Sequence, residues 1–294
     1  MAVMTGVPGR AGSTPPGRHA ASVRTRVVAP LRSLLAPLRN ALVQTGEMTL
    51  LMFRVIGEAV RHPIGYWADV RDQMHGILKL CWFPMIVSTT AFGFGAPGIQ
   101  GGNLYALFGI PERLGSFFIM ASVREFAPWI NAMVVAGVIG TAMTADLGAR
   151  RIREEIDAME VLGIEPIRTL VVPRVIAVTI MTGLLDLVAL TFGIVGGYIA
   201  AVPLLGASSG SYFASFFANA TVTELWGSVL KTTLFGLIIG VVCCYKGLTA
   251  QGGPIGVGRA VNQAVVISFA AIWVFNFVFT TILLGLNPAM QVYK

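Results

Sequence analysis

The fold is decided by residues 175–202, which read VIAVTIMTGLLDLVALTFGIVGGYIAAV and contain one charged residue, Asp186. A helix of this length is longer than the roughly 20 residues that cross the hydrocarbon core of a bilayer. An apolar run of such length is typical of a transmembrane helix rather than of a helix in a soluble core. The sequence therefore predicts a membrane span at about 175–202.

Four other stretches share this character. No charge occurs between Lys79 and Glu112, and the glycines and the proline after residue 95 favour a first span that ends there. Only 12% of the 294 residues are charged and 55% are hydrophobic, with a mean hydropathy of +0.75, whereas a soluble domain has about 25% charged residues. We therefore expect an all-α membrane protein with five transmembrane helices, the other four at about 80–95, 126–145, 225–245 and 261–286.

The amino-terminal region divides into two parts. Residues 1–39 are rich in Gly, Pro, Ser and Arg, which predicts a disordered basic cytoplasmic tail. Residues 40–75 are predicted to include an amphipathic helix in the membrane interface, because Glu47, Arg54 and Glu58 share one helical face. A soluble helix that packs on another element is the alternative.

The basic residues predict the orientation in the membrane. Of the 21 Lys and Arg residues, ten precede the first span, five lie between the second and third spans, and two lie between the fourth and fifth. Cytoplasmic loops carry an excess of Lys and Arg. We therefore expect a multi-pass protein of the cell (inner or plasma) membrane, with a cytoplasmic amino terminus and the carboxyl terminus outside. Membrane placement explains the net charge of +7 without nucleic acid.

Several kinds of chemistry find no support in the sequence. The three cysteines lie in apolar stretches and the three histidines show no metal-ligand or triad spacing, so we predict neither a metal site nor a catalytic site. The pattern G-x-x-x-x-G-K-[ST], which cradles nucleotide phosphates, does not occur. Energy for any transport driven by ATP would come from another subunit.

The loop between the second and third predicted spans is densely charged. Residues 146–174 contain eleven charged residues, so this loop faces water. Ile152, Ile156, Met159 and Gly163 recur at helical spacing, which predicts an amphipathic helix at about 149–163 that Gly163 ends. Its narrow apolar ridge suits docking into a groove of a partner, and a solvated loop helix is the alternative.

Two segments resemble a known family. Residues 152–174, IREEIDAMEVLGIEPIRTLVVPR, closely resemble the signature of the MlaE/YrbE permeases, the membrane subunits of ABC transporters that work with MCE-domain lipid-binding proteins. Residues 252–266, GGPIGVGRAVNQAVV, are similar to the family's loop into the last span. The resemblance covers about residues 40–290, which would form the permease domain.

The resemblance implies a function and a set of partners. The helix at 149–163 would be the coupling helix, which sits in a groove of the ABC ATPase subunit. No cofactor would bind this chain, because the ATPase binds ATP and magnesium. The cargo would be a hydrophobic lipid, either phospholipid, fatty acid or sterol, and the other partners would be MCE proteins, membrane lipids and a second permease, identical or paralogous. The residues implied in coupling are Ile152, Glu154, Glu155, Ile156, Asp157, Met159 and Glu160.

Three charged residues in or directly beside predicted spans are candidates for a translocation path, namely Asp186, Glu224 and Lys231. Such residues usually face a bundle interior or a cavity. Asp186 could equally be paired with a base or protonated, and Glu224 and Lys231, seven residues apart, could pair with another helix. Proton-coupled secondary transport through Asp186 and a non-transporting membrane scaffold are the rival functions.

Overall fold

The computed structural model describes residues 22–291, with side chains for residues 39–288 and for Met290. Between residues 22 and 291 it contains no strand, which confirms the all-α fold class. The chain divides into two units, residues 1–49 and 50–294, and each is described by itself.

The first unit contains most of helix α1 (Ser22–Arg61). The predicted disordered tail falls outside the described residues up to position 21. Residues 22–39 belong to α1 in the structure, and the disordered basic tail stays a prediction. The glycines of the tail all precede residue 18, and residues 22–39 contain none, so the two halves of the tail differ in composition.

A sharp turn joins α1 to the first span. The predicted interfacial helix at 40–75 is interrupted after Arg61, and helix α2 (Trp67–Gly93) begins at Trp67. Pro63 disfavours a helical conformation for the residue before it. The hydroxyl of Tyr66 donates to the carbonyl oxygen of Ala59 at 3.1 Å and fixes the turn. Residues 67–75 therefore belong to the first span.

The first span is longer than the predicted 80–95. Helix α2 continues as the π-helix η1 (Phe94–Gln100) and then as α3 (Gly101–Leu107). Pro97 lies inside η1. The wider π turn accommodates the missing proline N–H, so the chain bends instead of ending its helix.

Among residues 22–291, five apolar helical segments are long enough to cross a membrane: Trp67–Leu107, Pro111–Ile152, Ile167–Leu204, Val222–Leu248 and Gly253–Leu286. They confirm the five predicted spans, and each extends beyond the predicted bounds at one end or both. The elements of the second span are η2 (Pro111–Arg113), α4 (Leu114–Phe118), η3 (Ile119–Phe126), α5 (Ala127–Val135), η4 (Ala136–Gly140) and α6 (Thr141–Ile152). The remaining elements are α7 (Glu155–Val161), η5 (Ile167–Val171), α8 (Val172–Ile199), η6 (Ala200–Leu204), α9 (Ser209–Asn219), α10 (Val222–Leu248), α11 (Gly253–Leu286) and η7 (Pro288–Gln291).

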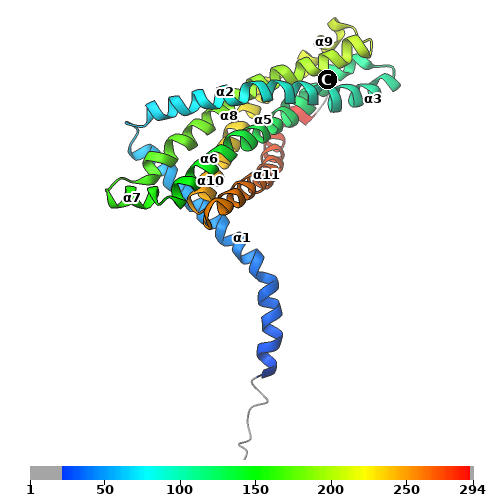
Figure 1. The fold of residues 1–294 in the computed structure, drawn as a ribbon. Helices are drawn as coiled ribbons and strands as arrows, with labels where there is room; N and C mark the ends of the chain where they lie inside the picture. The colour runs from blue at the N-terminus through cyan, green and yellow to red at the C-terminus, as the bar shows by residue number, and fades with distance from the viewer. Residues whose placement is uncertain (1–21, 292–294) are drawn as a thin grey trace, which may run out of the picture. The chain divides into compact units, whose positions relative to one another are not determined.

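Helices α8 and α10 form the centre of the bundle (Figure 1). Helix α8 packs against α2, α5 and α10, and α10 packs in addition against α6 and α11. The α2–α8 contact is close because glycines meet there: a Cβ atom on Gly93 would lie 2.4 Å from the carbonyl oxygen of Gly193. The backbones of α2 and α8 can approach this closely only without a side chain at Gly93.

This close approach makes a first prediction. Gly93→Ala is expected to lower the free energy of unfolding by about 1–3 kcal/mol, because the new methyl group forces the two backbones apart. Gly76→Ala is the matched control in the same helix, since a Cβ atom there would meet nothing within 4 Å. Thermal unfolding in detergent compares the two variants. Equal melting temperatures would show that the helices shift apart at no cost.

Helix α9 carries aromatic residues at helical spacing. Tyr212 and Phe216 are buried, whereas Phe213 and Phe217 are exposed. Burial raises the pKa of the Tyr212 hydroxyl, which therefore stays protonated. Side-chain hydrogen bonds tie α9 to the start of the second span, as when the hydroxyl of Ser215 donates to the carbonyl oxygen of Glu112 at 2.7 Å.

Candidate functional site

Six polar residues from three spans meet inside the bundle, and we call them the polar cluster. Element η3 supplies two, α10 supplies two and α11 supplies two. The members are Arg124, Glu125, Glu224, Lys231, Asn276 and Thr280.

The first half of the polar cluster is an ion pair between Arg124 and Glu224. The Nε–H of Arg124 donates to Oε2 of Glu224 at 3.2 Å, and a terminal nitrogen donates to Oε1. The same nitrogen donates to the carbonyl oxygen of Met290 at 3.1 Å. Only 8% of the Arg124 side chain and 4% of the Glu224 side chain are exposed. Arg124 therefore joins the start of α10 to the segment that follows α11.

The second half of the polar cluster surrounds Lys231. Its ammonium group donates to Oδ1 of Asn276 at 3.0 Å, to Oγ1 of Thr280 at 2.9 Å and to the carbonyl oxygen of Arg124 at 2.6 Å. It also lies 3.4 Å from Oε1 of Glu125. Glu125 in turn accepts hydrogen bonds from Asn276 at 2.6 Å and Thr280 at 2.8 Å. The buried lysine thus has the several partners that a charge inside a membrane protein requires.

The cluster changes how the charged residues are understood. The adjacent Arg124 and Glu125 suggest mutual neutralisation when the sequence is considered alone, but each pairs with a different residue of α10. Glu224 and Lys231 do lie on one face of α10 and pair with other helices. Their place in a translocation path stays a prediction.

Sequence reasoning overlooked the α11 members of the cluster. Asn276 and Thr280 lie one helical turn apart in a span that is otherwise strongly apolar at this level. Polar side chains one turn apart share a helix face. That spacing was the available signal, and it would have pointed to a polar contact from this face of α11.

Asp186 takes no part in the hydrogen bonds of the polar cluster, although its carboxyl group interacts electrostatically with Lys231. Its side chain is fully buried, and Ser228 donates to its Oδ2 atom at 2.6 Å. Its Oδ1 atom and the Oδ1 atom of Asn131 have no hydrogen-bond partner among the described residues. Among the described residues, no basic side chain lies within ion-pair distance of Asp186. Asp186 therefore does not form the ion pair that the sequence left open as one alternative.

This environment predicts the effect of Asp186→Asn. The amide is nearly isosteric, keeps an acceptor for Ser228 and removes a buried ionisable group, so no loss of unfolding free energy is expected. Ser228→Ala should instead cost about 1–3 kcal/mol, because it leaves the carboxyl group of Asp186 without a hydrogen bond. Thermal unfolding of both variants checks that Ser228→Ala has the lower melting temperature. A large loss of stability in Asp186→Asn alone would show that the negative charge is needed.

The predicted coupling helix at 149–163 is two helices in the structure. Helix α6 ends at Ile152, and α7 begins at Glu155. Glu154 between them has φ of 60° and is the one non-glycine residue with positive φ in the part of the chain that the structure describes. The left-handed backbone at Glu154 redirects the chain, so a single amphipathic helix is the wrong description. Gly163, with φ of +75°, ends α7 as predicted.

Ion pairs fasten α7 to the end of α6. Arg151 pairs with Asp157, and Arg153 pairs with Glu155 at 3.0 Å. Arg150 lies 3.6 Å from the same Glu155 carboxylate. Two of the four acidic residues expected to contact a partner are therefore engaged within the chain.

The other two acidic residues remain available. Glu154 and Glu160 are exposed and form no ion pair with any residue from 39 to 288. Glu154 directly precedes α7, and Glu160 lies in its last turn. A partner with basic residues would meet these two carboxylates first.

The apolar surface of α7 differs from the predicted ridge. Ile156 is only 4% exposed and packs within the chain, and Ile152 and Met159 are half-buried. The exposed apolar side chains are Val161, at 88%, and Leu162, at 74%. The predicted spacing identified the face of α7 that packs inward, and the outward apolar surface lies at the carboxyl end of the helix.

Comparison with known proteins places the chain in a family. Residues 68–282 match the family model described as Permease MlaE. A probable ABC transporter permease protein of Rickettsia typhi is 31% identical over 238 residues, which cover 81% of this chain and 91% of that protein. The chloroplastic protein TRIGALACTOSYLDIACYLGLYCEROL 1 of Arabidopsis thaliana is 32% identical over 216 residues, or 74% of this chain and 61% of that protein. This chain therefore belongs to the MlaE family of ABC transporter permeases.

Proposed function

We propose that this permease moves hydrophobic lipids across or out of a membrane and is powered by a separate ATPase that docks on the α7 segment, residues 153–166. The observation that carries the proposal is the outward surface of this segment. Two apolar side chains, Val161 and Leu162, are exposed there, as are Glu154 and Glu160, two carboxylates without an ion-pair partner among the residues with described side chains. Exposed apolar groups beside unpaired charges are typical of a protein-binding surface.

The attachments of α7 suit it to transmit force. Two ion pairs join α7 to α6, a third joins α7 to Arg153 in the turn between the two helices, and Arg174 at the start of α8 pairs with Asp146 in α6. A push on α7 therefore reaches both the second and third spans. In the proposed mechanism, closure of the ATPase on ATP moves α7, and the attached spans rock and open or close a cavity for the lipid. The permease residues perform no covalent chemistry in this scheme.

The lipid cargo is supported by the relatives and by the interior. The Arabidopsis relative is named after trigalactosyldiacylglycerol, a lipid. The bundle's charged groups are paired or buried, as in the polar cluster, so few remain to hold a polar substrate. We therefore infer a phospholipid, fatty acid or sterol as cargo.

The remaining partners follow from the same proposal. ATP and magnesium bind the ATPase, a second permease of identical or paralogous sequence completes the transporter, and MCE proteins carry lipid on the other side of the membrane. The excess of Lys and Arg supports an orientation with the α7 segment and the amino terminus in the cytoplasm and the carboxyl terminus outside.

Purification of the tagged chain tests this function. Gently solubilised wild-type protein is expected to retain an ATPase, to hydrolyse ATP and to carry lipid. The variant Glu154→Lys/Glu160→Lys should lose the ATPase while its span helices and its bound lipid remain, because neither carboxylate has an ion-pair partner among the described residues. A wild-type chain that purifies without an ATPase in several mild detergents would contradict the proposal and would favour proton-coupled transport or a scaffold.

A further inference from the structure

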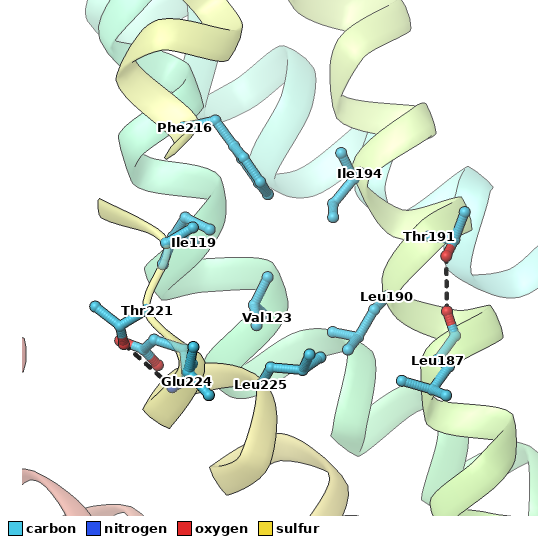
Figure 2. A pocket seen from close by; sticks show the side chains of 12 residues that line it. Ile119, Val123, Leu187, Leu190, Thr191, Ile194, Phe216, Thr221, Glu224 and Leu225 are labelled. Carbon is cyan, nitrogen blue, oxygen red and sulfur yellow. Dashed lines mark hydrogen bonds between the residues drawn. The ribbon is translucent and has the colours of Figure 1, made fainter. Parts of the chain in front are cut away.

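A groove of about 450 Å³ lies among the helices, and no residue of the α7 segment lines it (Figure 2). Its walls come from η3, α8, the end of α9 and the start of α10. The side chains of Val123, Leu190, Ile194 and Leu225 line it, and Phe216 closes one end (Figure 2). The volume falls within the range of small-molecule pockets, roughly 300–1,000 Å³.

The few polar groups of this groove already have partners. The hydroxyl of Thr191 donates to the carbonyl oxygen of Leu187 at 2.8 Å, and Oγ1 of Thr221 accepts from the backbone N–H of Glu224 at 3.2 Å. The Glu224 carboxylate is held by Arg124. A trapped water needs about two to four polar partners. The groove offers few, so it is suited neither to water nor to a charged ligand.

The surroundings of the groove decide what fills it. Leu187 on its wall is 45% exposed, and Leu184 and Val195 on the same helix are 50% and 40% exposed. These residues lie in a membrane span, so their exposed faces meet the hydrocarbon of the bilayer. A groove that is continuous with this surface loses dispersion contacts along its whole lining unless a hydrocarbon chain enters it.

We propose that the groove is a binding site for one acyl chain of a bilayer lipid, which enters from the side. The site is formed by the third and fourth spans together with η3, and no residue of α11 lines it. It is therefore separate from the Lys231 half of the polar cluster. The proposal requires only that the chain spans a membrane, so it does not depend on the ATPase.

A matched pair of variants tests the site. Leu187→Trp places an indole in the groove, whereas Leu184→Trp places one on the same helix at nearly equal exposure but outside the groove lining. Each protein is reconstituted in phosphatidylethanolamine and phosphatidylglycerol vesicles that contain a phospholipid with a diazirine in one acyl chain. The sample is washed in detergent to remove loosely bound lipid before irradiation, and adducts are located by mass spectrometry.

The expected result is lipid adducts on groove residues of the wild type and of Leu184→Trp, and loss of these adducts in Leu187→Trp. Ala220→Trp, which fills the groove from the segment between α9 and α10, should show the same loss if Leu187→Trp fails to fold. Adducts that are spread equally over Leu184 and the groove, or that persist in both filled variants, would overturn the proposal. Cross-links from the groove to a second polypeptide would also overturn it. No ATPase or ATP is present, so failure here leaves the proposed transport function untouched.

Discussion

Arg124→Ala is expected to lower the free energy of unfolding by about 3–5 kcal/mol, because it leaves the buried carboxylate of Glu224 without its partner. The variant also removes the hydrogen bond to the carbonyl oxygen of Met290, so the segment after α11 loses its attachment to η3. Equilibrium unfolding in bicelles measures the free energy, and thermal unfolding in detergent ranks the variants.

Two further variants show whether the loss of stability comes from breaking the buried ion pair or from removing an arginine side chain. Arg124→Met/Glu224→Leu removes both charges and should recover most of the stability, since replacing a buried pair with apolar residues is often neutral or stabilising. Arg71→Ala breaks an exposed pair with Asp72 and should change the unfolding free energy by less than about 0.5 kcal/mol. If Arg124→Ala proved as mild as Arg71→Ala, Glu224 would have to be neutral or hydrated in the folded protein.

The positions of the spans were predictable because the length of a charge-free apolar run determines them. A charge-free run such as residues 126–145 has no stable place except the membrane, so its existence follows from the sequence alone. The ends were not predictable from the same property. Helix α2 begins at Trp67, well before the last charge at Lys79, because charged residues in a helix can lie outside the hydrocarbon.

The pairing of the charges depends on contacts that are distant in sequence. Arg124 and Glu224 are separated by 100 residues, and Glu125 and Asn276 by 151. Periodicity reports which face of one helix a residue occupies, but it does not report which helix lies opposite that face. The seven-residue spacing of Glu224 and Lys231 therefore indicated a shared face, and the partners became visible only with the packed bundle.

The α7 segment shows a second limit of periodicity. Apolar residues at helical spacing can face either the protein's own core or a partner, and the two cases have the same pattern. Ile156 faces the protein's own core, and only 4% of it is exposed. The left-handed backbone at Glu154 had no signal in the sequence, because glycine is the residue that usually marks such a position.

The exposed end of α7 makes the prediction with the largest functional effect. Val161→Asp/Leu162→Asp is expected to weaken ATPase binding by about 2 kcal/mol or more, or about thirtyfold, if these side chains anchor the interface as central apolar residues usually do. The side chains are 88% and 74% exposed, so the permease itself should fold normally. ATPase retention on the tagged permease and stimulated ATP hydrolysis are the measurements.

Leu107→Asp/Phe108→Asp is the matched control, because these two apolar side chains are similarly exposed, at 83% and 73%, but lie where the first span ends, in a different part of the bundle. It should leave ATPase retention unchanged. Ile156→Asp is expected to behave differently from both, since a buried charge would unfold the α7 segment and lower stability as well as binding. Full retention of the ATPase in Val161→Asp/Leu162→Asp would contradict docking on this exposed surface, whatever the result for Ile156→Asp, because unfolding of α7 alone explains a loss of binding in that variant. The residues to mutate next would then be the half-buried Ile152 and Met159.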